Sequence, residues 1–143
     1  MSHVVDASVW VSDLYPLDVN HAASRRYFER VRDRSEWLLE PNLLLCECAG
    51  AMSRRTQNRL IAAGVVVTVS ATPNVTLEAL TPLRAEEAAT VAANHAIRGA
   101  DSVYVQLASE SGAILITWDN EMLARAPVVV QTMTPGDWLA ANP

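Results

Sequence analysis

Short apolar runs alternate along most of the chain with longer segments in which apolar side chains recur at helical spacing. The runs that we expect to form strands are 3–5, 36–40, 75–79, 113–116 and 128–130. Helical spacing and helix-start residues indicate helices that begin near Ser8 and that cover 20–34, 42–55, 83–96, 100–112 and 121–125. Strands that alternate with helices predict an α/β fold, with a central parallel sheet of about four to five short strands flanked by helices.

Three segments are less determined by their pattern. Residues 65–69 are β-branched and fit a strand, but they continue a helical segment from Thr56, and we expect a helix. The apolar helix face over 43–52 suits either the core or a dimer interface. The chain is expected to finish as a polar tail through Pro135 and Gly136.

Length and composition indicate one compact domain over residues 1–143. The chain has 143 residues, 50% of them hydrophobic, which is enough for one core. The N-terminal residues lack the features of a signal peptide, and no apolar run is long enough for a bilayer, so we expect a cytoplasmic protein. Cys46 and Cys48 would point to different faces of a helix, which predicts two buried or half-buried free thiols.

The formal net charge of −5 argues against a general nucleic-acid binder. The basic residues are all arginines, however, and most of them are concentrated in one part of the chain. The members of this arginine cluster are Arg25, Arg26, Arg30, Arg32, Arg34, Arg54, Arg55 and Arg59. Arginine suits bidentate contact with phosphate, so the cluster is either a phosphate track or, as we prefer, a solvated surface.

Acidic residues stand at positions where an α/β fold binds ligands. Asp6 and Asp119 each follow an expected strand, and ligands bind beyond the carboxyl ends of parallel strands. Asp101 lies in the first turn of an expected helix, where the dipole favours a carboxylate. Taken singly, each of these three would be a cap or turn residue. Glu47 is different, because it lies mid-helix among small and apolar neighbours and needs a partner.

Carboxylates that converge repel one another, so such a cluster requires protons or cations. Ligands that are all oxygen suit Mg²⁺ or Mn²⁺, whereas Zn²⁺ prefers histidine and cysteine ligands, which are not spaced for it here. A divalent ion held in this way orients a phosphodiester and activates a water molecule. The sequence therefore predicts phosphodiester hydrolysis by the acidic residues Asp6, Glu47, Asp101 and Asp119.

The segments around these acids resemble a known family. DASVWV, PNLLLCECAGAMSRR and RGADSVYVQLASESGAILITWDNEML, in this order and at this separation, resemble the PIN-domain toxins of the VapC type. The resemblance covers essentially the whole chain. Each motif alone has little specificity, since D-x-S after a strand is common, but four acidic positions in the right order are specific.

The resemblance assigns roles to individual residues. The expected metal ligands are Asp6, Asp101 and Asp119. Glu47 would complete the acidic pocket. The residues expected to orient carboxylates or waters from behind them are Ser8, Thr117 and, at the rim, Asn120. Trp118, which precedes Asp119, is expected to narrow the mouth of the site or to stack on a base.

The resemblance also implies a function and partners. It implies a metal-dependent endoribonuclease that uses Mg²⁺ or Mn²⁺ and acts as the toxin of a toxin–antitoxin pair. The substrate would be RNA, such as tRNA or rRNA. The partners would be an antitoxin whose C-terminal segment occupies the groove and a second copy of the chain in a homodimer.

Rival functions fit the residues less well. A phosphatase of the haloacid-dehalogenase type needs a second aspartate two residues after the first, where this chain has Ser8. A receiver-type signalling domain needs a lysine opposite its acidic pocket, and this chain has none. The alternative that stays open is a PIN fold that binds nucleic acid or protein without nuclease activity.

Overall fold

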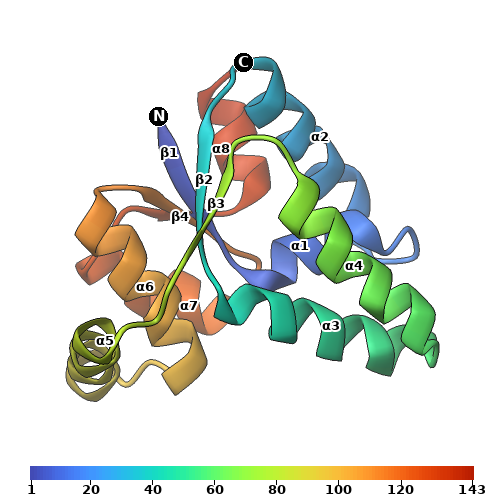
Figure 1. The fold of residues 1–143 in the computed structure, drawn as a ribbon. Coiled ribbons are helices and arrows are strands. Elements are labelled where there is room, and N and C mark those ends of the chain that lie inside the picture. The colour runs from blue at the N-terminus through green and yellow to red at the C-terminus, as the bar shows by residue number, and fades with distance from the viewer.

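A computed structural model describes residues 1–143 and contains one sheet of five parallel strands (Figure 1). The strands are β1 (Ser2–Val5), β2 (Trp37–Pro41), β3 (Val75–Glu78), β4 (Ile114–Ile116) and β5 (Thr132–Met133). Their order across the sheet is β3-β2-β1-β4-β5. Parallel neighbours require crossover connections, and helices supply most of each one. The predicted α/β class with its parallel sheet is confirmed.

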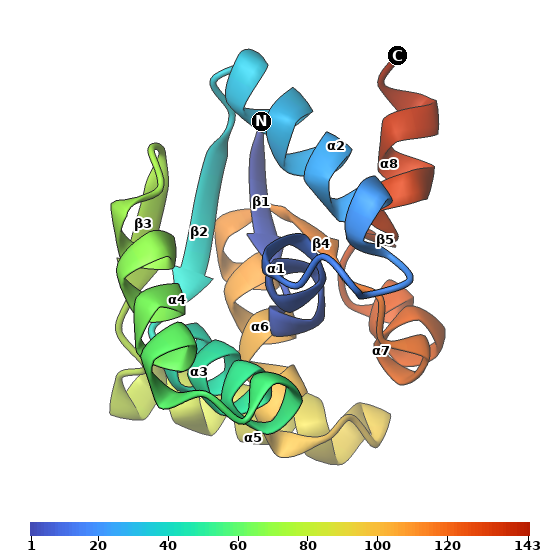
Figure 2. The same cartoon turned by 90° about the vertical axis from the view of Figure 1, so that its right-hand side faces the viewer.

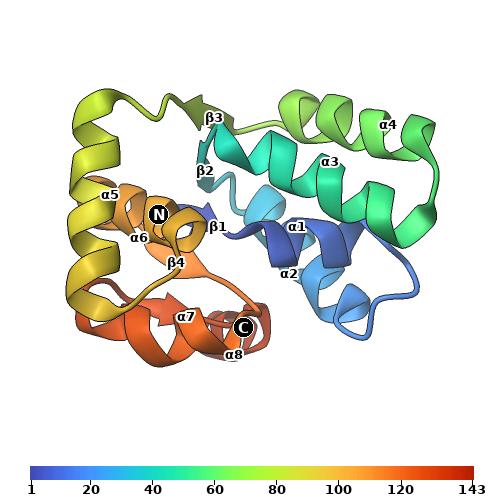
Figure 3. The ribbon, with the colours of Figure 1, turned by 90° about the horizontal axis from the view of Figure 1, so that it is seen from below.

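Helices cover both faces of this sheet. They are α1 (Ala7–Leu14), α2 (His21–Asp33), α3 (Leu43–Thr56), α4 (Arg59–Ala71), α5 (Pro82–His95), α6 (Gly99–Ser111), α7 (Asn120–Arg125) and α8 (Pro135–Ala141), with a 3₁₀ turn, η1 (Ala126–Val128). One face carries α1, α2, α4 and α8 (Figure 2). The other carries α6, with α5 outside it (Figures 1 and 3). None of the helices combines the length and the apolar character that a membrane crossing requires.

The structure decides the two segments that the sequence left open, residues 65–69 and the apolar face of 43–52. Residues 65–69 lie in α4, as expected, and Val65 and Val69 turn inward from it. The apolar face of α3 presents Cys48 and Met52 to the core. Cys48 is buried as predicted, but the prediction was wrong for Cys46, which is exposed because its side chain lies on the outer face of α3.

The expected strand over 128–130 is wrong. The chain instead makes the 3₁₀ turn η1, because the backbone N–H groups of Val129 and Val130 both bond back to the carbonyl of Ala126. Pro127 lies inside this turn and has no N–H to give to a strand ladder. The strand forms a few residues later, as β5.

The expected polar tail is also wrong, because residues 135–141 form α8. Thr134 caps this helix by accepting the backbone N–H of Asp137, and Pro135 occupies its first turn. Trp138 is fully buried and packs edge-on against the rings of His3 and Tyr27. A single aromatic side chain thus anchors a segment whose other residues are largely polar or small.

Near the carboxyl ends of β1 and β2, a side chain replaces the backbone ladder. The two strands are in register only at Ser2 with Trp37 and His3 with Leu38. Farther along, both carboxyl oxygens of Glu40 accept the backbone N–H of Val5, at 3.2 and 3.1 Å. The indole N–H of Trp10 donates to the same group at 3.3 Å. Glu40 is completely buried and takes part in no ion pair, so burial raises its pKa well above that of an ordinary glutamate.

This raised pKa predicts a pH dependence of stability. The folded state keeps a proton on Glu40 that the unfolded chain releases above a pKa near 4.5, so the stabilisation is lost as the pH rises toward the folded-state pKa. Glu40→Gln carries no charge at any pH. We expect its free energy of unfolding to fall less between about pH 5 and about pH 8 than that of the wild type, as measured by urea denaturation. Glu29→Gln, on the exposed side of α2, should keep the wild-type slope. Equal slopes for wild type and Glu40→Gln would contradict this assignment.

Candidate active site

Asp6 lies at the carboxyl end of β1 and is only 6% exposed. Its Oδ2 accepts hydrogen bonds from the hydroxyl of Ser8 at 2.5 Å and from the hydroxyl of Thr117 at 2.9 Å. The backbone N–H of Ser8 also donates to Oδ2, at 3.3 Å, so Asp6 is the N-cap of α1. We had expected Ser8 to be the cap, but Asp6 precedes the first turn and its carboxylate reaches the free N–H.

The hydroxyls of Ser8 and Thr117 also bind the backbone of the loop that follows β4. The hydroxyl of Ser8 accepts the backbone N–H of Trp118 at 3.1 Å, and that of Thr117 accepts the backbone N–H of Asp119 at 2.9 Å. Each hydroxyl therefore donates to Asp6 and accepts from the loop. Because β1 and β4 are neighbours, this exchange brings Asp119 to the edge of the sheet where Asp6 lies.

The side chain of Trp118, unlike its backbone N–H, bonds to α2. Its indole N–H donates to the hydroxyl of Ser24 at 2.8 Å, which directs the ring towards α2. The ring therefore strengthens the contact between the β4 loop and α2.

Arg98 connects two of the other acids, and the sequence interpretation did not include it. Its Nη2 donates to Oδ2 of Asp119 at 2.5 Å, and its Nε donates to Oδ2 of Asp101 at 2.7 Å. Asp101 lies in the first turn of α6, as predicted. Asp119 is the N-cap of α7 and uses its Oδ1 to accept the backbone N–H of Met122. Oε2 of Glu121 lies 3.5 Å from Nε of Arg98. The only sign of this contact in the sequence is that Glu121 follows Asp119 by two residues.

Glu47 has the partner that its position required. The hydroxyl of Tyr104 donates to Oε2 of Glu47. Tyr104 is fully buried on α6 and follows Asp101 by three residues, so both side chains leave the same side of that helix. The pattern of the sequence offered no signal that this tyrosine, rather than another apolar residue, faces Glu47.

The pKa values show that the acids share one electrostatic environment. Burial raises the pKa of Asp6, against the opposing effect of its hydroxyl donors, and the charge of Asp119 adds to the rise. Burial likewise raises the pKa values of Glu47 and Asp101, and the negative charge of Asp6 contributes to both. Burial also acts on Asp119, but the N–H of Met122 and the guanidinium of Arg98 outweigh it and lower that pKa.

The donor atoms suit a hard divalent cation, although they are not arranged as a finished cluster. All four acids offer oxygen alone, which is what Mg²⁺ and Mn²⁺ prefer. No three acidic, histidine or cysteine side chains come together as a ready-made metal site, and Arg98 lies between Asp101 and Asp119. Asn120, expected at the rim, is exposed, and its side chain makes no hydrogen bond to any of the four acids.

A hollow of about 310 Å³ leads from Glu47 and Ser8 along α3 to Arg54 and Arg55. Arg54 folds back along its helix, and its Nη1 lies only 3.3 Å from the place where a Cβ on Gly50 would be. Glycine at this position therefore leaves room for the guanidinium in the hollow. The hollow thus holds one of the four acids, Glu47, together with two arginines.

The rest of the arginine cluster has mixed roles. Arg25 pairs with Asp13, and Arg55 pairs with Asp18. Arg30 and Arg34 donate to carbonyl groups at the C-terminus, which ties α2 to the end of the chain. The preferred interpretation, a solvated surface, did not include these structural contacts. Arg54 lines the hollow that also contains Glu47.

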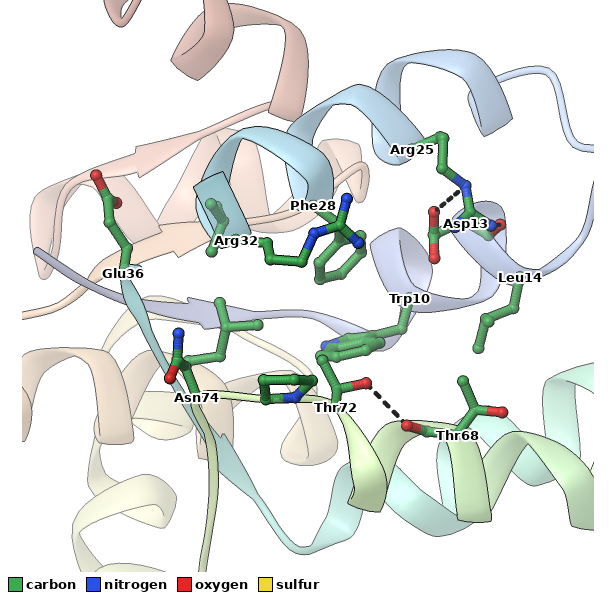
Figure 4. Close-up of a pocket in the computed structure, with 13 residues that line it drawn as sticks. Trp10, Asp13, Leu14, Arg25, Phe28, Arg32, Glu36, Thr68, Thr72 and Asn74 are labelled. Carbon is green, nitrogen blue, oxygen red and sulfur yellow. Dashed lines mark hydrogen bonds and ion pairs between the residues drawn. The ribbon is translucent and has the colours of Figure 1, made fainter. Parts of the chain in front are cut away.

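A second hollow, of about 190 Å³, lies between α2 and α4 (Figure 4). Trp10 and Phe28 lie within it, their ring centroids 4.4 Å apart. The ion pair of Asp13 with Arg25, 3.1 Å from Oδ1 to Nε, stands at its edge (Figure 4). None of the four acids borders this hollow, so it is not a place for the expected metal chemistry.

The hydroxyl contacts of Asp6 predict the effect of removing one of them. Thr117→Val replaces the hydroxyl with a methyl group of similar size, so Asp6 loses a donor that favours its charged form. We expect the pKa of Asp6 to rise above its wild-type value in a carboxyl-carbon NMR titration. The free energy of unfolding should fall by about 1–3 kcal/mol, because Asp119 also loses the acceptor of its N–H. Thr90→Val, on the exposed face of α5, is the matched control. An unchanged Asp6 pKa in Thr117→Val would refute the role of this hydroxyl.

Solved structures with the same fold include toxins and toxin–antitoxin complexes. VapC20 of Mycobacterium tuberculosis, a toxin that cleaves the sarcin–ricin loop, is 20% identical, with a TM-score of 0.73 over 85% of this chain and 93% of that chain. PAE2754 from Pyrobaculum aerophilum is 20% identical, with a TM-score of 0.69 over 99% of this chain and 97% of that one. VapBC2 from Rickettsia felis, bound to a promoter DNA fragment, is 10% identical, with a TM-score of 0.70 over 94% and 98%.

At these identities the structural neighbours establish a shared fold. Among curated protein sequences, none matches the chain significantly. The model of the PIN domain family, however, matches residues 3–128, a segment that runs from β1 to η1 and contains all four acids. The chain therefore belongs to the PIN domain family.

Proposed function

We propose that this PIN-domain protein is a metal-dependent endoribonuclease and the toxin of a type II toxin–antitoxin module. The observation that carries the proposal is that Asp6, fixed by two hydroxyls at the carboxyl edge of the sheet, lies near three further carboxylates whose charges act on one another. An edge of this kind suits a divalent cation and a phosphodiester. The structural neighbour VapC20, a toxin that cleaves the sarcin–ricin loop, supports the choice of RNA.

In this proposal Asp6, Asp101 and Asp119 hold Mg²⁺ or Mn²⁺. When bound, the ion supplies charge stabilisation to the phosphate and makes a water molecule more acidic. Ser8 and Thr117 keep Asp6 in one orientation, which preserves the geometry of the site.

Glu47 is placed to act as the general base. Tyr104 occupies its Oε2, which leaves Oε1 to accept a proton from the attacking water. Burial raises the pKa of Glu47 towards the range in which a carboxylate takes up a proton more readily. The tyrosine therefore orients the base and does not take part in the proton transfer itself.

The hollow beside Glu47 supports a nucleic-acid substrate. A net charge of −5 repels nucleic acid in general, so binding has to depend on local positive charge. Arg54 supplies that charge at the far end of the hollow along α3 and is placed to contact a phosphate beside the cleaved bond. We propose structured RNA, either tRNA or rRNA, as the substrate in the cytoplasm.

The first test removes one carboxylate. Asp6→Asn keeps the size of the side chain but loses the charge, and we expect RNA cleavage to fall by at least about a hundredfold, since weaker perturbations of metal sites cost about 10–100-fold. Purified protein would be incubated with tRNA and rRNA, with Mg²⁺ or Mn²⁺ and with EDTA. Asp33→Asn, an exposed acid at the end of α2, is the matched control and should cleave like the wild type.

Two outcomes would count against the nuclease proposal. Cleavage that survives both EDTA and Asp6→Asn would contradict a mechanism that depends on metal and carboxylates. Tight RNA binding without cleavage under any metal would favour the alternative, a PIN fold that serves as a binding module.

The second test concerns the groove. Arg54→Gln removes one phosphate contact and leaves the acids in place, so we expect KM for RNA to rise roughly fivefold while kcat changes little. The salt dependence of binding should weaken by about one phosphate contact. Arg26→Gln, an exposed arginine on α2, is the control for net charge. If both variants raise KM equally, the effect comes from overall charge and not from the groove.

We also propose two protein partners, an antitoxin and a second copy of this chain. Several structural neighbours are toxin–antitoxin complexes, and we propose an antitoxin partner for this chain as well. As the resemblance implies, we propose that the C-terminal segment of the antitoxin occupies the groove that contains Glu47. A homodimer is also proposed. The buried face of α3 does not serve it, because Leu44 and Cys48 are already in the core.

A further inference from the structure

Arg98 is the one cation that contacts the metal-site acids directly. Its side chain is 57% exposed, yet Nε and Nη2 each donate to a different carboxylate, Asp101 and Asp119. A guanidinium is always charged in a protein, so both contacts are ion pairs. A single positive charge thus sits between two of the three expected ligands.

The neighbouring arginine shows how specific this placement is. Arg125 leaves α7 close by, but it pairs with Glu121 at 2.8 Å and donates to the carbonyl of Ala96. It contacts neither Asp101 nor Asp119. Both arginines approach Glu121, but only Arg98 also contacts the expected metal ligands.

We propose that Arg98 is an internal counter-ion that a divalent cation must displace before it can bind Asp101 and Asp119. The inference rests on the proposed function, since it assigns a regulatory role within the same metal site. The Oδ2 atoms of both acids are committed to Arg98, and Oδ1 of Asp119 is committed to the N–H of Met122. Each of these oxygens keeps a further lone pair, so it is the positive charge of the guanidinium, 2.7 Å or less from both carboxylates, that opposes a divalent cation at this place.

The side chain of Arg98 is free to leave. Its backbone is fixed at the start of α6, where its carbonyl accepts the N–H of Ser102, and the preceding Ile97 is buried. The guanidinium, by contrast, is more than half exposed and hangs on a long flexible stem. Exposed pairs of this kind are weak enough to yield to a competing divalent ion. Arg98 consequently lowers the metal affinity of the site and protects the acids from mutual repulsion while the metal is absent.

The test measures metal binding without RNA and without turnover. Mn²⁺ would be titrated calorimetrically into purified wild type, Arg98→Gln and Arg125→Gln at low salt. We expect Arg98→Gln to bind Mn²⁺ roughly fivefold more tightly than the wild type, because two exposed ion pairs no longer compete. Arg125→Gln carries the same change in net charge and should stay close to the wild type. Equal tightening in both variants, or no tightening in Arg98→Gln, overturns the inference.

A second readout follows the guanidinium itself. In nitrogen NMR spectra, the Nε–H signal that is lost in Arg98→Gln belongs to Arg98. Addition of Mg²⁺ to the wild type is expected to shift this signal towards that of a solvent-exposed arginine, with no comparable shift for Arg125. If Mg²⁺ binds and the Arg98 signal keeps its position, the guanidinium is not displaced and the inference is wrong.

These outcomes separate the inference from the proposed function. Binding of Mn²⁺ to the wild type that disappears in Asp6→Asn supports the metal centre, whichever way Arg98 behaves. Absence of Mn²⁺ binding in the wild type and in both arginine variants contradicts the metal centre, and with it the role of Arg98.

Discussion

The main constraint on this structure is a carboxylate, that of Asp6, which is buried at the end of the central strand β1 and must be stabilised there by its neighbours. Asp6 is almost without solvent, and three other acids lie close enough to affect one another's pKa values. Hydroxyl groups and backbone N–H groups satisfy Asp6, and a tyrosine satisfies Glu47. Only Arg98 brings positive charge to the group. The four acids therefore carry more negative charge than Arg98 can neutralise, which is typical of a site that binds a divalent cation.

The fold creates this situation through the carboxyl ends of its parallel strands. β1 ends in Asp6, and the adjacent β4 leads into Thr117 and Asp119. On the other side of β1, Glu40 bonds to the backbone where the ladder to β2 has ended. The sheet edge is thus held by side chains on both sides, so the position of Asp6 is fixed from β2 as well as from β4. Loss of either support would affect the site and the stability of the protein together.

Residues with local signals could be predicted from the sequence, and those with long-range partners could not. The first strands, the helix over 65–69 and the position of Asp101 follow from apolar spacing and helix-start chemistry. Tyr104 and Glu40 act through partners 30 to 57 residues away, and no periodicity reports such contacts. Arg98 has a local partner in Asp101, but its contact with Asp119, 21 residues away, has no signal in the sequence. The errors near the C-terminus have the same origin. α8 depends on Trp138, whose burial is decided by α2 and β1, and the run 128–130 is apolar enough for a strand but contains a backbone turn.

We propose that Asp6, Asp101 and Asp119 form one metal centre whose internal counter-ion is Arg98. The most direct measurement is anomalous scattering from crystals of the protein soaked in Mn²⁺. The account predicts a manganese peak about 2.0–2.2 Å from carboxylate oxygens of Asp6 and of at least one of the other two aspartates, with Arg98 turned away from them. A crystal in which Arg98 still bridges Asp101 and Asp119 at saturating Mn²⁺, with manganese elsewhere or absent, would contradict it.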